Sequence, residues 1–193
     1  MPGSCLPAVL LSATLLFTFG CAEPPNKEMD QAQGAIDAAR AAGAEQYATT
    51  EYTAATTSLK NAHDAVAAGD YRLALDRALA SHQRAQNAAR ETANSKAAMR
   101  AGAERTLAEL DTFLAQTDAR LATARRARVP QRQLAEPIKA LAAIRADVQK
   151  AREAVDAGEY LTAEQELEGM RARIDEVLTA IAATTTPPVR RRR

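Results

Sequence analysis

A long stretch without helix-breaking residues constrains the fold of this chain most. Between Tyr71 and Pro130 there is no proline, and Gly102 is the only glycine. Proline inside a helix removes a backbone hydrogen bond and clashes with the preceding turn, so its absence leaves this stretch free to form one helix. A helix of about 58 residues would be about 87 Å long at 1.5 Å per residue. We therefore expect a single helix to form the spine of the molecule.

Small side chains dominate the composition. Of the 193 residues, 47 are alanines, which supply about half of the apolar fraction. Alanine has the highest helix propensity and lets helix axes approach closely, so this composition favours tightly packed helices over strands. Along the spine, mostly small side chains recur at steps of three and four, at Ala78, Ser81, Ala85, Ala88, Thr92, Ser95 and Met99. We expect the alanine-bearing face of the first helix to lie on this seam.

A glycine followed by an acidic residue and a tyrosine occurs twice, 89 residues apart. Glycine just past a helix end takes the left-handed conformation, and the acidic residue can cap the next helix, aspartate better than glutamate. We expect each copy to be the elbow of a helical hairpin, with the first tyrosine wedged between its two helices. The copies are Gly69, Asp70 and Tyr71, and Gly158, Glu159 and Tyr160.

The remaining helices follow from the apolar period and its breaks. We expect a first helix ending near Tyr47, a second capped by Thr49 and Thr50, a fourth over 131–157 whose regular start Pro137 delays, and a fifth over 158–181. The predicted fold is all-α, with antiparallel helical hairpins forming two three-helix units fused through one long shared helix. The first unit is expected at 27–100, the second at 101–183, and a mobile basic tail at 184–193.

The N-terminus carries the most specific functional signal. Residues 1–22 have no charged side chain. Leu6 to Phe19 form an apolar run long enough for the core of a signal peptide, but shorter than the ~20 residues that a membrane-spanning helix needs. The run ends at Gly20 and Cys21. This ending resembles the lipobox of bacterial lipoproteins, in which cleavage after a small residue leaves a diacylglycerol-linked cysteine at the mature N-terminus.

The lipobox resemblance implies a signal peptide at 1–20 and a lipidated tether at 21–26. Because Ala22 rather than aspartate follows the cysteine, it also implies an outer-membrane destination. Cys5 would leave with the signal peptide, and acylation would consume Cys21, so no thiol would remain for a disulfide or a metal cluster. Thr18 and Phe19 depart from the usual lipobox, and the alternatives are an uncleaved anchor or a simple signal peptide.

Two further motifs lie in the first half of the chain. Residues 43–48 read Gly-Ala-Glu-Gln-Tyr-Ala, and residues 68–71 read Ala-Gly-Asp-Tyr. Both resemble an Ala-rich helical domain of unknown function that occurs in many Gram-negative lipoproteins, and the likeness covers about Asp30 to Ala98. The proline that commonly follows the first motif is Thr49 here.

Residue types that carry catalysis or bind metals form no recognisable pattern. His63 and His82 stand at different distances from Gly69, so a hairpin would not bring them opposite each other, and neither lies in a metal-ligand motif. Three alternating glutamates at 164, 166 and 168 would spread around a helix rather than pair. We expect no catalytic residue, no metal and no cofactor.

Two groups of arginines remain. One surrounds the end of the spine, at Arg120, Arg125, Arg126, Arg128 and Arg132, and the other ends the chain, at Arg190, Arg191, Arg192 and Arg193. Without the terminal group the formal charge changes from +1 to −3, so the body of the protein is not a polyanion binder by net charge. Each group is either a solvated surface or a contact for an anionic polymer, which in the periplasm means lipopolysaccharide, acidic phospholipid or peptidoglycan.

The sequence favours a lipid-tethered scaffold or adaptor on the periplasmic face of the outer membrane, without enzymatic activity. Its expected partners are the membrane, through the anchor, and an envelope protein or peptidoglycan, with no nucleic acid. One alternative is a binding module for a small ligand held between helices. Another, if the lipobox is accidental, is a nucleic-acid binder with a basic tail.

Overall fold

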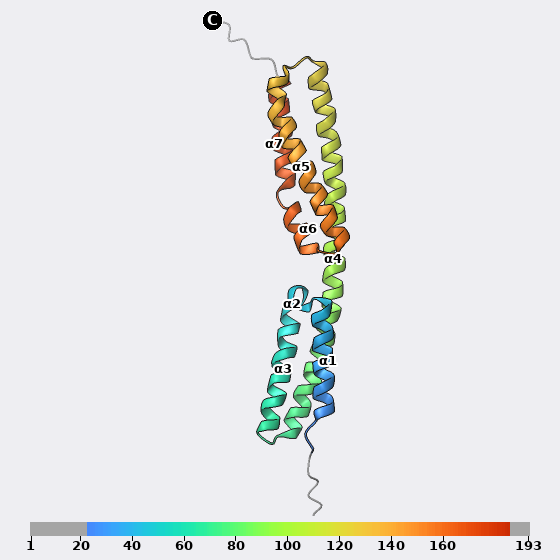
Figure 1. The fold of residues 1–193 in the computed structure, drawn as a ribbon, viewed down its shortest axis with the longest axis vertical. Helices are drawn as coiled ribbons and strands as arrows, with labels where there is room; N and C mark the ends of the chain where they lie inside the picture. Colours follow the sequence, from blue (N-terminus) through green and yellow to red (C-terminus); the bar gives the residue numbers. More distant parts are fainter. Residues whose placement is uncertain (1–22, 186–193) are drawn as a thin grey trace, which may run out of the picture.

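The computed structural model describes residues 23–185, and every regular element among them is an α-helix. The all-α prediction is therefore confirmed. In chain order the helices are α1 (Asn26–Ala42), α2 (Ala44–Tyr47), α3 (Thr49–Ala67), α4 (Tyr71–Arg126), α5 (Gln131–Ala157), α6 (Tyr160–Leu167) and α7 (Met170–Thr185) (Figure 1).

The long helix α4 is unbroken from Tyr71 to Arg126. Its 56 residues span about 84 Å. Gly102 lies inside it, and a Cβ atom at that position would meet no other part of the protein within 4 Å, so the glycine neither breaks the helix nor makes room for a neighbour. The predicted spine is present, and all other helices lie along it (Figure 1).

Helices α1, α2 and α3 pack against the first part of α4, and we call them, with residues 71–92, the proximal bundle. Alanines make up most of its core, and Ile36, Tyr52 and Leu59 are among its few large side chains. Of the seven residues of the predicted seam on α4, the first five are buried, whereas Ser95 and Met99 are half-buried. Helix α1 contacts α4, as expected from its alanine-bearing face.

Helices α5, α6 and α7 pack against residues 103–126 of α4 to form the distal bundle. Large aliphatic side chains fill this core, and the fully buried ones include Leu110, Leu134, Ile144, Met170 and Ile174. Burying such a side chain contributes about 1.5–3 kcal/mol, several times what the single methyl group of alanine contributes. The distal bundle therefore gains more stabilisation per core residue than the proximal one.

Between the bundles, residues 93–102 of α4 form a waist. None of these residues is buried. Tertiary packing gives the waist little support, so its helix depends on its own backbone hydrogen bonds and on the packed segments on either side. The waist separates two different ends: α1 begins and α3 turns into α4 at the proximal end, while α4 turns into α5 and α7 finishes at the distal end (Figure 1).

The first helix ends earlier than the sequence suggested. Helix α1 stops at Ala42 because Gly43 takes a left-handed φ of 98°, and α2 is a separate single turn. Lys96 of α4 donates a hydrogen bond to the Ala42 carbonyl at 2.7 Å and lies 5.0 Å from the centre of the Tyr47 ring. The three-and-four spacing runs on through the break, so the apolar pattern does not reveal it.

The predicted caps of the second helix, Thr49 and Thr50, are wrong. The cap position of α3 is Ala48, without a side-chain hydrogen bond, and Thr49 is already helical. The hydroxyl of Thr49 donates instead to the Glu45 carbonyl at 2.9 Å. Backbone hydrogen bonds continue across this junction, since Ala48 N donates to the preceding turn and Tyr52 N donates to the Ala48 carbonyl.

The expected fifth helix is two helices, and the expected delay in the fourth does not occur. Helix α6 ends at Leu167, and Gly169, with φ of 73°, separates it from α7. Leu167 and Met170 are buried on either side of the break, so the apolar spacing conceals it. Pro137 lies buried in the second turn of α5, which begins regularly at Gln131.

We predict that Gly43→Ala destabilises the protein more than Gly69→Ala does. Both glycines have positive φ, so each substitution incurs roughly 1–2 kcal/mol for a left-handed residue with a Cβ atom. At Gly43 the new Cβ would also lie 3.3 Å from Lys96 Nζ, whereas at Gly69 it would meet nothing within 4 Å. Disturbing the Lys96 hydrogen bond adds about 1 kcal/mol. Chemical denaturation measures the difference, and equal midpoints for the two variants would contradict this role of Lys96.

Candidate functional site

The two predicted elbows share one hydrogen-bond pattern. After α3, Gly69 N donates to the carbonyl three residues back and Asp70 N to the carbonyl five residues back; Gly158 N and Glu159 N do the same after α5. Both glycines have positive φ, 75° and 78°. This is the Schellman arrangement, which satisfies carbonyl groups at a helix end.

The residues after the elbow glycines differ in side-chain capping and are alike in burial. The Asp70 carboxylate accepts a hydrogen bond from Leu73 N at 2.9 Å, whereas Glu159 makes no side-chain cap. Tyr71 and Tyr160 are half-buried, and neither belongs to the described residues that pack against a core. Both begin a helix, where side chains lean toward the N-terminal end and hence past the end of the core. The wedge role of Tyr71 therefore stays a prediction from the sequence.

The turn between α4 and α5 repeats the elbow pattern with an arginine in place of the glycine. Arg128 N donates to the Arg125 carbonyl at 3.0 Å, and Val129 N donates to the Ala124 carbonyl at 3.2 Å. Arg128 has a φ of 58°, and it is the only non-glycine residue with positive φ in the range 23–185. A left-handed conformation costs such a residue roughly 1–2 kcal/mol. The sequence marked Arg128 only as one of several arginines.

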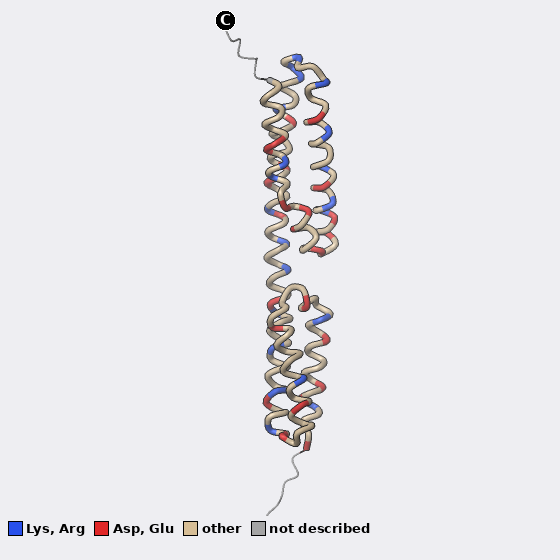
Figure 2. Tube along the Cα trace, turned by 90° about the vertical axis from the view of Figure 1, so that its left-hand side faces the viewer, with Lys and Arg blue, Asp and Glu red and all other residues tan. Residues whose placement is uncertain are grey.

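Five arginines surround this turn, and we call them the distal arginine cluster: Arg120, Arg125, Arg126, Arg128 and Arg132. All five are exposed, and no aspartate or glutamate occurs between Asp118 and Glu136. Within the described part of the chain, no side chain of the cluster has an ion pair or a hydrogen bond. Figure 2 shows the basic residues gathered at this end of the tube.

Three arginines elsewhere in the distal bundle have acidic partners. Arg145 of α5 pairs with Asp118 of α4 at 2.5 Å, and Arg152 of α5 pairs with Asp111 of α4. Arg173 of α7 donates to Asp147 of α5 at 2.8 Å. That hydrogen bond, together with one from Lys150, holds the pKa of Asp147 below its usual value. The five arginines of the distal cluster differ from these three in having no acidic partner among the described residues.

Helix electrostatics accounts for two of the five members of the cluster and disfavours a third. Arg125 and Arg126 occupy the last turn of α4, where the partial negative charge of the helix end favours cations. Arg132 lies in the first turn of α5, where the partial positive charge disfavours them. That turn has no acidic residue, and its cap position, Pro130, makes no side-chain hydrogen bond. Arg128 carries the backbone strain described above.

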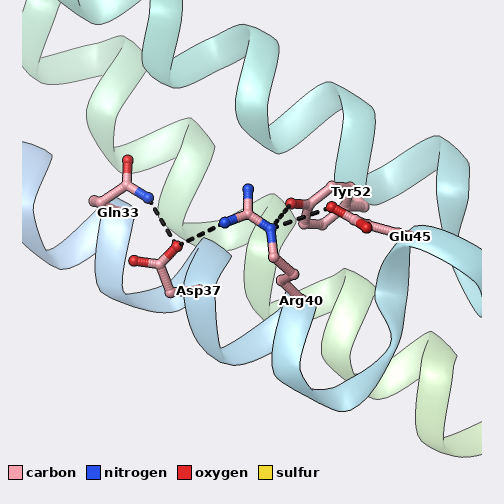
Figure 3. Close-up of polar contacts among 5 residues, drawn as sticks. All are labelled: Gln33, Asp37, Arg40, Glu45 and Tyr52. Atoms are coloured by element: carbon pink, nitrogen blue, oxygen red, sulfur yellow. Dashed lines mark hydrogen bonds and ion pairs between the residues drawn. The ribbon is translucent and has the colours of Figure 1, made fainter.

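A second polar cluster, in the proximal bundle, joins α1 to α3 (Figure 3). Arg40 Nε donates to the Tyr52 hydroxyl at 2.7 Å and to Glu45 at 3.1 Å, and Arg40 also pairs with Asp37 at 3.4 Å. The hydrogen bonds to Tyr52 and Glu45 raise the pKa of Arg40. Nothing in the sequence pattern linked Arg40 to Tyr52, which lies twelve residues later. Because its groups satisfy one another, this cluster acts as a clamp between helices.

Other residues that the sequence singled out are spread over the surface. His63 is exposed and His82 is half-buried on a different helix. Glu164 and Glu168 line a groove that α6 forms with the waist, beside Met99 and Gly102. Among residues 23–185 no group of three or more histidines, cysteines or acids is placed to hold a metal ion. Over the same range, no helix combines the length and hydrophobicity that crossing a bilayer requires.

Several predicted site residues fall outside the described residues. They are Gly20 and Cys21 of the lipobox resemblance and Arg190, Arg191, Arg192 and Arg193 of the tail. Their roles stay predictions from the sequence.

We predict opposite stability effects for two substitutions that remove the same charge. Arg128→Gly relieves the left-handed strain and should stabilise the protein by about 1 kcal/mol. Arg120→Gly places glycine in a helix interior and should destabilise it by about 1 kcal/mol. Chemical denaturation midpoints measure both effects. A loss of stability in Arg128→Gly as large as that in Arg120→Gly would show that the arginine side chain itself supports the turn.

Comparison with known proteins locates one domain in the chain. No curated protein and no solved structure matches the chain. Residues 27–105 match the model of a family described as a domain of unknown function, DUF4398. The match covers α1, α2, α3 and α4 as far as the waist and just beyond it, and it ends before the distal arginine cluster. The chain therefore contains a DUF4398 domain at residues 27–105, in agreement with the domain of unknown function expected from the two motifs.

Proposed function

We propose that this protein is an outer-membrane lipoprotein that acts as a helical scaffold or adaptor on the periplasmic side of the cell envelope, without enzymatic activity. One observation carries the proposal: the start of the fold and the distal arginine cluster lie at opposite ends of one continuous helix of 56 residues. That helix is about 84 Å long. A protein anchored at its N-terminus therefore holds its distal end far from the membrane.

The anchor part of the proposal rests on the sequence before the described residues. Cys21 follows Gly20 after an apolar run, and α1 begins at Asn26. Five residues of fully extended chain reach at most about 18 Å. A lipid on Cys21 would thus keep the proximal bundle close to the bilayer surface.

The scaffold part is supported by what the polar side chains do. Arg40 and Tyr52 join α1 to α3, Lys96 holds the end of α1 on α4, and Ser81 Oγ donates to the Ala55 carbonyl of α3 at 2.8 Å. Each of these groups is engaged in holding helices together. A rod whose polar contacts set its own geometry suits the role of a spacer between two attachment points.

We predict that Cys21→Ser abolishes metabolic labelling with palmitate and releases the protein from membranes washed at high salt. Thioether linkage of the lipid requires the cysteine sulfur, and a serine hydroxyl does not replace it. Cys5→Ser is the matched control, since Cys5 would be removed with the signal peptide and its loss should leave labelling unchanged. The labelled wild-type protein should co-fractionate with outer membranes.

Two results would contradict the proposal separately. Retention of the Cys21→Ser protein on salt-washed membranes would reject lipid anchoring at this residue. Residence of the labelled wild-type protein in inner-membrane fractions would reject the outer-membrane location and leave the lipid anchor in place.

A further inference from the structure

We propose that the distal arginine cluster is a binding site for the carboxylate groups of peptidoglycan, which would join the far end of the rod to the cell wall. The choice of peptidoglycan among anionic partners rests on the proposed periplasmic location. The starting observation is that five arginines at the distal end are exposed and without an acidic partner in the described part of the chain. Guanidinium groups bind carboxylates through two parallel hydrogen bonds, so each member offers a matching fork.

The fold itself does not account for two members of the cluster. Arg128 occupies a left-handed position that glycine occupies in both elbows, and Arg132 stands at a helix start that disfavours a positive charge. Mutual repulsion among five unpaired cations adds to the electrostatic cost. Features that disfavour the folded state and concentrate in one place are typical of binding surfaces, because the ligand compensates for them.

The directions of the arginines favour a flexible chain over a flat surface. At 100° per residue, Arg125 and Arg126 lie about 140° and 240° round the axis of α4 from Arg120. These three charges thus point in different directions around α4. A flat bilayer would touch only one side of such an arrangement, whereas a polymer strand can follow it.

The position of the cluster also disfavours the membrane that holds the anchor. About 84 Å of helix separates it from the proximal end, so an upright rod does not bring it back to that bilayer. Lying flat would require positive charge along the rod, but the chain without its terminal arginines has a net charge of −3.

The test is cosedimentation of the purified full-length protein, in detergent, with purified peptidoglycan sacculi. A variant with Arg125→Gln, Arg126→Gln, Arg128→Gln and Arg132→Gln should bind roughly 80-fold to 600-fold more weakly, from about threefold to fivefold per arginine. Binding by the wild type should also fall as salt screens the charges. Arg128→Gly alone should bind several-fold more weakly although it folds more stably, which separates binding from folding.

A matched control removes four other exposed cations, by Lys27→Gln, Arg72→Gln, Arg77→Gln and Arg105→Gln, and should bind sacculi almost as well as the wild type. Sacculi whose carboxylates have been amidated should no longer bind the wild type. Equal binding by the cluster variant and the wild type would overturn the proposal. So would undiminished binding to amidated sacculi, an equal loss in the control variant, or cluster-dependent binding to phosphatidylglycerol vesicles with none to sacculi.

These outcomes are independent of the anchor. Cosedimentation in detergent does not require the lipid on Cys21, so a failure of the fractionation experiment would leave the binding result standing. A failure of cosedimentation would leave the proposed anchor and scaffold in place.

Discussion

The structure depends on the continuity of backbone hydrogen bonds along α4 through the waist. Residues 93–102 contribute no buried side chain, so the helix there is maintained by intrinsic propensity and by its packed continuations in both bundles. Alanine, lysine, methionine and arginine are good helix formers, and they offset Gly102, which costs about 1 kcal/mol relative to alanine. Extending a helix that is already nucleated on both sides is far easier than starting one. The waist therefore determines the distance between the two bundles and their relative orientation.

The two bundles use different means to pack against the same helix. In the proximal bundle, alanine seams bring α1 and α3 close to α4, and specific polar contacts such as those of Lys96 and Ser81 add to a thin core. The distal bundle has a core of leucine, isoleucine and methionine, with ion pairs across its surface. The DUF4398 domain comprises the proximal bundle and the waist. The proposed contact with the cell wall therefore lies in the part of the chain outside that domain.

The sequence predicted those features that local chemistry determines. The absence of proline between Tyr71 and Pro130 predicted the spine, and the three-and-four spacing predicted the buried seam. The sequence did not predict the helix breaks at Gly43 and Gly169, because the apolar spacing runs through both. Each break appears only in the backbone angles. The sequence identified the distal arginines, but their lack of acidic partners depends on how α4 and α5 pair. The strain at Arg128 became visible only once its turn proved to repeat the elbow hydrogen bonds.

The most direct test of this account is the distance between spin labels on either side of the waist, measured by double electron–electron resonance. Glu91 and Glu109 are both exposed on α4, and labels on Glu91→Cys and Glu109→Cys would be five full turns apart on one face, in a protein whose native cysteines are serine. A continuous helix predicts a single narrow distribution near 27 Å. A broad distribution, or a second population at shorter distance, would show that the waist bends and that α4 does not hold the two ends apart.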